Sequence, residues 1–142
     1  YGMSTIRKIG FAFGASVLLL SSQALAEGDA AKGEKVFKKC MACHSVEEGT
    51  NKVGPSLYGI VGRPASQIED YRYSKINHAA EEAGLVWTEE NIFNYLEDPQ
   101  GFLEGYLKDQ GKDAPGRTKM AFKLKKEDER LDVIAYLKSV AQ

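Results

Sequence analysis

The stretch Cys40-Met41-Ala42-Cys43-His44 contains both cysteines of the chain and one of its two histidines. This C-x-x-C-H spacing is the attachment pattern of haem c. Two thiols can add across the two vinyl groups of a haem, and a two-residue gap on a helical turn sets the sulfurs at the vinyl positions. The next imidazole then projects onto the iron from the same side. The stretch therefore predicts one covalent haem c held by Cys40 and Cys43, with His44 as an iron ligand.

Three other kinds of site could use the same cysteine pair. A thioredoxin-like C-x-x-C motif needs a βαβ setting, and the sequence shows no alternating strand pattern. A structural zinc site needs four ligands, usually in two pairs, whereas only His78 could join this cluster and the adjacent Cys43 and His44 make poor zinc geometry. A disulfide across so short a gap is strained and leaves His44 without a role. We therefore favour haem attachment.

Residues 1–26 have the layout of a secretory signal peptide. Arg7 and Lys8 precede an apolar run over residues 9–20, and residues 24–26 supply an A-x-A cleavage site. The apolar run is shorter than the ~20 residues that span a bilayer. We therefore expect cleavage after Ala26, export to the periplasm and a mature domain over residues 27–142, with an uncleaved anchor as the alternative.

A second iron ligand is expected from a methionine or the other histidine, because haem iron of this class is commonly held by His and Met. Met41 lies inside the attachment turn and cannot reach the opposite face, and Met3 lies in the predicted signal peptide. Met120 and His78 are left. A lone histidine on an expected helix is usually a solvated surface residue, so Met120 is the favoured ligand and His78 the alternative.

Length and composition indicate one ordinary globular domain. The chain has 142 residues, of which 43% are hydrophobic and 27% charged. The formal net charge of −1 gives no bias toward nucleic acid. Because the expected signal peptide carries two cations and no acid, its removal would make the net charge −3. Nucleic acid is therefore not an expected partner.

Helical signals recur along the chain with long irregular segments between them. Helices are expected over residues 27–39 with Asp29 as N-cap, over 74–83, from Thr88 to about residue 98, over 100–108, and from Glu127 onward. Glycine and proline punctuate residues 45–73 too often for a long helix or strand. So long an irregular segment is unusual in a compact domain, unless its loops wrap a cofactor. The prediction is an all-α fold of three to five helices around a haem.

Several motifs in order give the chain a family resemblance. They are CMACH, GPSLYGIVGR, YRYSKIN, the single Trp87, YLEDP, TKMAF and RLDVIAYLK, spread over about residues 28–140. In these the chain resembles class I cytochromes c, and within them the soluble bacterial cytochrome c2 type. The resemblance implies a monomeric one-electron carrier, not an enzyme, that serves membrane redox complexes in respiration or photosynthesis.

The resemblance also implies the kinds of partner. A quinol:cytochrome c oxidoreductase would be the donor, and an oxidase or a photosynthetic reaction centre the acceptor. A haem enzyme such as a peroxidase, or a haem sensor with an open iron position, is the alternative function.

Residue roles follow from the same resemblance. The carbonyl of Pro55 should accept from the His44 ring. The residues expected around the haem propionates are Arg63, Tyr73, Trp87 and Thr118. Those expected near Met120 are Asn77 and Tyr95, and the packing between the first and last helices should involve Gly33, Phe37 and Tyr136. Twenty residues separate Pro99 from Met120, more than in mitochondrial-type sequences.

Lysines flank both expected ligand segments. Lys38 and Lys39 precede the attachment cysteines, and Lys119 and Lys123 flank Met120, whereas the acids cluster elsewhere, as in residues 127–129. We expect a local lysine ring at the exposed haem edge to guide docking, even though the whole chain is acidic.

Overall fold

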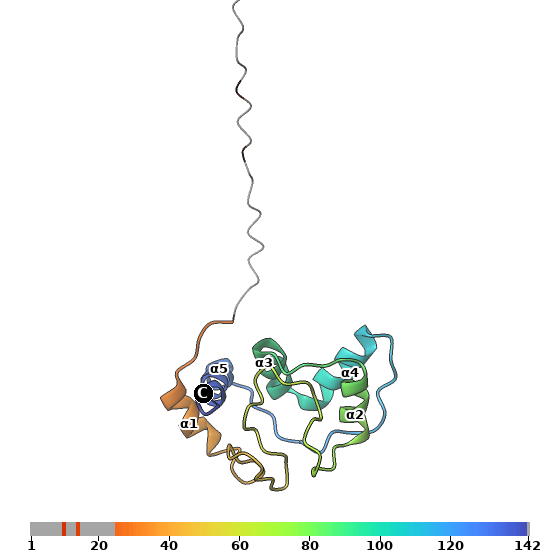
Figure 1. Ribbon diagram of the computed structural model, residues 1–142, viewed down its shortest axis with the longest axis horizontal. Helices are drawn as coiled ribbons and strands as arrows, with labels where there is room; N and C mark the ends of the chain where they lie inside the picture. The colour runs from red at the N-terminus through yellow and green to blue at the C-terminus, as the bar shows by residue number, and fades with distance from the viewer. Residues whose placement is uncertain (1–9, 11–13, 15–24, 142) are drawn as a thin grey trace, which may run out of the picture.

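The computed structural model describes residues 10, 14 and 25–141, and these form five helices joined by long loops (Figure 1). The helices are α1 (Ala30–Phe37), α2 (Lys75–Glu82), α3 (Glu89–Glu97), α4 (Pro99–Asp109) and α5 (Glu127–Ser139). No strand occurs in the described residues, only an isolated antiparallel bridge between Pro64 and Val86. The all-α prediction is confirmed. The expected signal peptide falls mainly on residues outside those described, so it stays a prediction.

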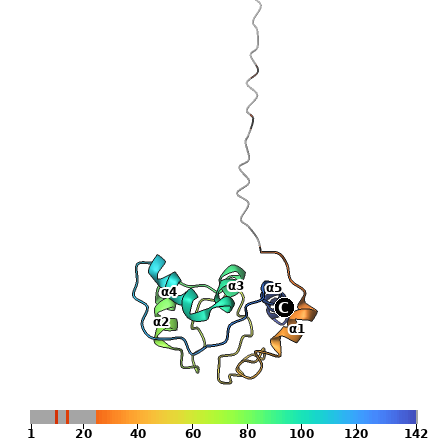
Figure 2. The same cartoon turned by 180° about the vertical axis from the view of Figure 1, so that it is seen from behind.

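Helices α1 and α5 pack against each other at one end of the molecule, and α2 lies beside α4 at the other, with α3 between the pairs (Figures 1 and 2). The α1–α5 crossing depends on Gly33. A Cβ on this residue would lie 1.9 Å from the backbone oxygen of Asp132. Beside it, the ring of Phe37 packs on the ring of Tyr136 with centroids 5.4 Å apart. The packing expected between the first and last helices is therefore present.

Side-chain caps fix where the helices begin. The carboxylate of Asp29 accepts from the backbone N–H of Lys32 at 3.0 Å, and the Thr88 hydroxyl accepts from Asn91 N–H at 3.1 Å. Asp98 ends α3 and also caps α4, because its carboxylate accepts from Gly101 N–H at 3.2 Å. Proline suits the first turn of a helix, so α4 begins at Pro99, a residue earlier than expected from the sequence.

The irregular segment 45–73 is held by hydrogen bonds rather than by helices. Gly62 N–H donates to the Trp87 carbonyl at 2.7 Å, and Trp87 N–H donates to the Arg63 carbonyl at 2.8 Å. Ser56 is buried and donates its hydroxyl to the Glu47 carbonyl at 2.6 Å. These bonds bring Arg63 and Trp87 together although they are far apart in the sequence.

The hydrophobic core runs between the helices. Its largest fully buried apolar side chains include Ile76, Leu85, Leu103, Leu107 and Val133. Helix α5 also buries Arg130, which sequence reasoning did not single out. Within the described residues, no helix has both the length and the apolar character needed to cross a membrane.

Candidate cofactor site

A cavity of about 450 Å³ lies among the loops and α3 and α5. It brings together every site residue expected from the sequence: Cys40, Cys43, His44, Pro55, Arg63, Tyr73, Trp87, Tyr95, Thr118 and Met120. Apolar side chains fill much of the remaining wall, among them Leu57, Ile60, Ile92 and Leu96. A largely apolar cavity with a few converging polar groups is the usual form of a cofactor site.

His44 is oriented by its neighbours. Its Nδ1 lies 2.7 Å from the Pro55 carbonyl oxygen, which is the contact expected from the sequence. Burial lowers the pKa of His44 against the opposing effect of that carbonyl. A neutral ring that donates from Nδ1 keeps the Nε2 lone pair for a metal. His44 therefore has the tautomer and orientation of an iron ligand.

Gly54 is a site residue that sequence reasoning treated only as a turn former. A Cβ at this position would lie 2.5 Å from Cε1 of the His44 ring. Only glycine lets the backbone pass so close to the imidazole. The adjacent Gly54-Pro55 pair is the signal that could have pointed to it.

The attachment cysteines lie on a tight turn that continues from α1. Cys43 N–H and His44 N–H both donate to the Cys40 carbonyl, at 3.1 and 2.9 Å. Both cysteines line the cavity. The turn thus presents two thiols and one imidazole to the same cavity. Within the described residues, no group of three or more His, Cys, Asp or Glu side chains could hold a metal ion.

Met120 reaches the cavity from the loop after α4. Its Sδ accepts from the Tyr95 hydroxyl at 3.5 Å, and its N–H donates to the Thr118 hydroxyl at 3.4 Å. Burial raises the pKa of Tyr95 to about 12, so its hydroxyl stays protonated and able to donate. The Tyr95 ring in turn packs edge-on against Trp87, with centroids 4.8 Å apart.

Arg63 carries an incomplete set of partners. Its Nη1 and Nη2 donate to the carbonyls of Tyr58 and Ser56, at 2.9 and 3.4 Å, whereas its buried Nε has no partner. Burial lowers the pKa of this guanidinium. Buried polar groups are nearly always hydrogen-bonded, and an anionic carboxylate is a strong acceptor for a guanidinium. The orphaned Nε therefore fits a haem propionate.

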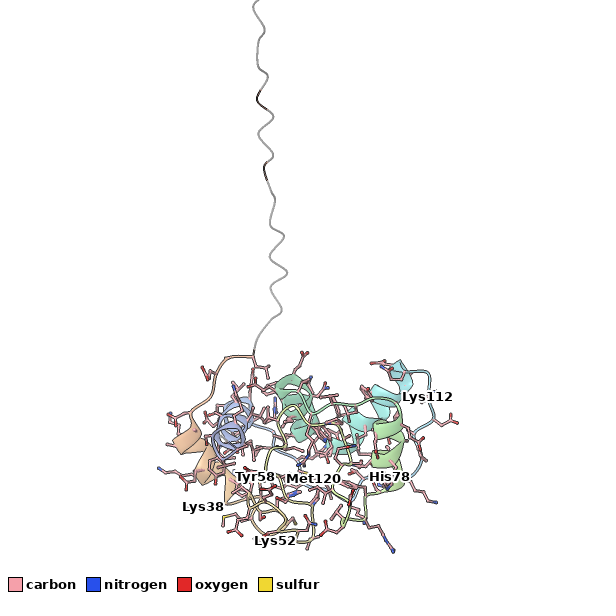
Figure 3. The ribbon with its side chains drawn as sticks, viewed as in Figure 1. Lys38, Lys52, Tyr58, His78, Lys112 and Met120 are labelled. Carbon is pink, nitrogen blue, oxygen red and sulfur yellow. The ribbon has the colours of Figure 1, made fainter. Side chains whose placement is uncertain are left out.

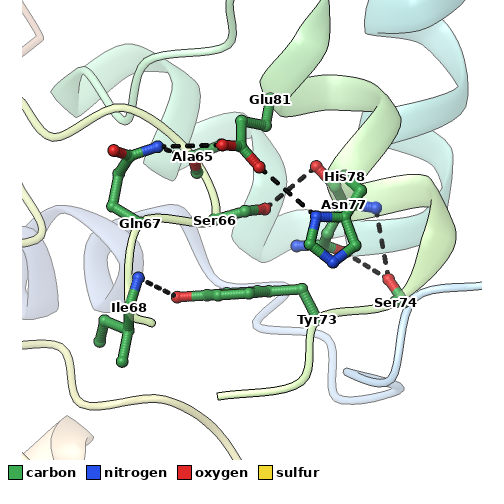
Figure 4. Close-up of polar contacts among 9 residues, drawn as sticks. All are labelled: Ala65, Ser66, Gln67, Ile68, Tyr73, Ser74, Asn77, His78 and Glu81. Atoms are coloured by element: carbon green, nitrogen blue, oxygen red, sulfur yellow. Dashed lines mark hydrogen bonds and ion pairs between the residues drawn. The ribbon is translucent and has the colours of Figure 1, made fainter. Parts of the chain in front are cut away.

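His78 does not line the cavity. Its exposed ring lies 3.5 Å from the Glu81 carboxylate and packs edge-on toward Tyr73 (Figure 4). The neighbouring Asn77 does line the cavity. The hydroxyl of Ser74, the N-cap of α2, donates to the Asn77 side chain at 2.8 Å. This supports the surface role weighed for His78 over its role as a ligand.

Comparisons with known proteins give the family of the chain. The family model described as cytochrome c matches residues 30–141. The chain belongs to the cytochrome c family. It is 57% identical over 115 residues to cytochrome c2 iso-2 of Rhodospirillum centenum, covering 79% of this chain and 95% of the relative. It is 55% identical over 111 residues to a cytochrome c2 of Rhodopseudomonas palustris, covering 77% and 96%.

Solved structures give the same family. The cytochrome c2 structure from Rhodospirillum centenum superposes with a TM-score of 0.78 at 56% identity, covering 81% of this chain and all of that one. This cytochrome c carries one covalently bound haem c and is an electron-transfer protein, not an enzyme. The predictions of fold, cofactor and functional class are confirmed, and the peroxidase alternative is set aside.

The expected separation of lysines from acids is wrong at two points. Lys39 lines the cavity, but its Nζ forms an ion pair with Glu129 at 2.9 Å, because the α1–α5 crossing brings the first turn of α5 to the attachment turn. Lys123 lies 3.7 Å from Asp98.

Lys119 donates to the Arg72 carbonyl and lies over the Tyr71 ring. Lys38 is exposed and has no ion pair within the described residues.

Proposed function

We propose that this cytochrome c is a soluble periplasmic one-electron carrier whose haem is attached through Cys40 and Cys43 and whose iron is held by His44 and Met120. One observation carries the ligand assignment. His44 and Met120 come from distant parts of the chain and line one cavity, and each is oriented by its own hydrogen-bond partner, Pro55 for the ring and Tyr95 for the sulfur.

The bound haem supplies an iron that takes up and releases one electron. The chain's own residues set the conditions for that exchange. Apolar walls exclude water, and the Tyr95 hydroxyl and Pro55 carbonyl limit the movement of the two ligands. Arg63, Tyr73, Trp87 and Thr118 are the proposed propionate partners. Met ligation and burial favour the reduced state, so a high reduction potential is expected.

The proposed partners are membrane redox complexes. A quinol:cytochrome c oxidoreductase would reduce the carrier, and an oxidase or a photosynthetic reaction centre would oxidise it. The family membership supports a role in electron transfer. The layout of residues 1–26 supports export. Mass spectrometry of the exported protein tests cleavage after Ala26.

The ligand assignment is tested by the ferric absorption spectrum. The wild-type protein should show the weak far-red band of a Met–iron bond. Met120→Ala should lose this band, become high-spin or water-ligated, and have a lower reduction potential. His78→Ala, the matched change of the rejected candidate, should leave the spectrum unaltered. The reverse pattern would make His78 the ligand.

Covalent attachment is tested separately. The haem should stay with the polypeptide after denaturation and extraction with acidified acetone. Colour that extracts from the wild-type chain would contradict attachment through Cys40 and Cys43.

A further inference from the structure

The segment that carries Met120 has very little backbone support. Lys112 N–H donates to the Leu107 carbonyl at 2.9 Å, and the next such bond is from Leu124 N–H to the Leu96 carbonyl at 2.7 Å. Within the described chain, no backbone-to-backbone hydrogen bond involves residues 113–123, here called the Met120 segment. Long loops have a large entropy to lose when they are fixed. Side chains must therefore set the position of Met120.

Gln100, in the first turn of α4, binds this segment upstream of Met120. Its Nε2 donates to the Gly116 carbonyl at 3.2 Å, and its Oε1 accepts from Thr118 N–H at 2.8 Å. One side-chain amide thus uses both its donor and its acceptor on the loop, as a neighbouring backbone would. Thr118 then accepts from Met120 N–H through its hydroxyl. Gln100 is therefore two hydrogen bonds away from the Met120 backbone.

Arg130, in the first turn of α5, binds the chain just downstream. Its Nη1 donates to the carbonyls of Leu124 and Lys125, at 3.0 and 2.9 Å. The guanidinium lies 4.3 Å from the Phe93 ring centroid, and its Nη2 is 3.9 Å from the Glu97 carboxylate. Arg130 is only 5% exposed. A buried charge is costly unless it is well compensated. Here the two loop carbonyls supply the close hydrogen bonds, whereas the buried Nε has no partner.

We propose that Gln100 and Arg130 are positioning residues that hold the chain on the two sides of Met120 and so limit how often the Met120 sulfur leaves the cavity. This inference rests on the proposed role of Met120 as an iron ligand. It assigns to two side chains outside the cavity lining an effect on ligand retention. Neither side chain touches the reacting atoms, so both act through the loop.

The chain offers a matched control for each residue. Glu104 accepts from Gln100 Nε2 at 2.7 Å but makes no bond to the loop, so Glu104→Ala disturbs Gln100 without removing the tether. Glu97 pairs with Arg130 from its exposed side, so Glu97→Ala removes the ion pair and leaves the two carbonyl bonds. Gln100→Ala and Arg130→Met remove the tethers themselves.

The experiment is a titration of the ferric holoprotein with imidazole, followed by loss of the far-red Met–iron band. Imidazole reaches the iron only when the Met120 sulfur is displaced, so its apparent dissociation constant falls as the displaced state becomes more populated. Gln100→Ala and Arg130→Met should lower this constant by roughly five- to tenfold, the effect of about one net hydrogen bond. Glu104→Ala and Glu97→Ala should change it by less than about twofold.

Two further variants distinguish positioning of Met120 from general stabilisation of the fold. Ile76→Val loosens the core in α2, a helix that carries neither Gln100 nor Arg130, and should lower resistance to guanidinium without changing imidazole affinity. Arg130→Lys keeps the charge, but its nitrogen lies one bond closer to the backbone than Nη1, the single nitrogen that binds both carbonyls, so it should resemble Arg130→Met. Tether variants that bind imidazole like their controls would overturn the proposal. A wild-type protein without the far-red band, or a band that survives Met120→Ala, would instead overturn the ligand assignment and the proposal with it.

Discussion

The hydroxyl of Tyr95 donates a hydrogen bond to the sulfur of Met120 across 3.5 Å. Tyr95 belongs to α3, and its position is fixed because its ring packs edge-on against the rings of both Trp87 and Phe102. The donor is permanent over the working pH range, since burial raises the pKa of Tyr95 to about 12. A hydrogen bond to the sulfur withdraws electron density from the atom proposed to bind the iron.

Tyr95→Phe should lower the reduction potential. Without the hydroxyl, the sulfur donates more strongly and stabilises the oxidised iron. A net hydrogen bond is worth about 1 kcal/mol, and a tenfold change in a one-electron equilibrium is about 59 mV, so the expected drop is about 40 mV. Equilibrium redox titration measures it. Tyr136→Phe on α5 is the control and should leave the potential unchanged. A potential that rises in Tyr95→Phe would contradict the argument.

Local features of the fold could be predicted from the sequence because they depend on near neighbours. Asp29 and Thr88 each cap a helix, and each accepts from the N–H of the residue three positions further along the chain. The attachment turn is likewise one short run of residues. Chemistry carried by a contiguous motif is therefore readable without knowledge of the tertiary structure.

Features that depend on distant contacts could not be predicted in this way. Arg130 carries no sequence signal of its burial, because Phe93 and two loop carbonyls cover it only in the folded chain. Lys39 and Glu129 are 90 positions apart and meet only because α1 crosses α5. Gln100 has no sequence signal of its own, since its partners lie in an irregular loop.

Gly33→Ala should destabilise the protein. The added Cβ would meet Asp132 O at 1.9 Å and the Tyr136 Cβ at 2.8 Å, so α1 and α5 would have to separate. Overpacking of this kind costs typically about 1–3 kcal/mol, and guanidinium unfolding measures it. Gly105→Ala in α4 is the matched control, because nothing lies within 4 Å of its added Cβ. That variant should gain about 0.4–1 kcal/mol. Equal effects of the two changes would rule out a close helix crossing.

Asp29 should make the stability of the protein depend on acid pH. The pKa of its carboxyl is lowered from 3.8, chiefly by the hydrogen bond from Lys32 N–H. A carboxylate whose pKa is lower in the folded than in the unfolded chain stabilises the protein at pH values above its unfolded pKa. This contribution disappears as the pH falls through the folded pKa.

Asp29→Asn separates the cap from the charge. Asparagine caps a helix as well as aspartate, so stability at neutral pH should change little. The loss of stability below about pH 4 should become smaller than in the wild-type protein. Urea unfolding at a series of pH values measures this. Asp113→Asn, the same change at an exposed loop residue that caps no helix, is the matched control. A stability that falls with acid pH as steeply in Asp29→Asn as in the wild-type protein would show that another group is responsible.

Docking to a redox partner should depend on Lys38. This residue is exposed beside the attachment turn, without an ion pair in the described chain, whereas Lys39 is paired with Glu129. Lys119 is unsuitable for the test, because its substitution would also break the bond to the Arg72 carbonyl. Lys112 is the matched control, since it is equally exposed at the far end of α4 (Figure 3).

Lys38→Glu and Lys112→Glu change the net charge equally, so any difference between them reports where the partner docks. If the partner binds at the attachment turn through opposite charges, Lys38→Glu should slow the second-order electron-transfer rate several-fold at low salt, and Lys112→Glu much less. The Debye length falls from about 30 Å at 0.01 M salt to about 8 Å at 0.15 M. The difference in rate between the two variants should therefore become small over that range of salt concentration. A rate independent of salt, or equal slowing by both changes, would mean that docking is apolar or uses another face.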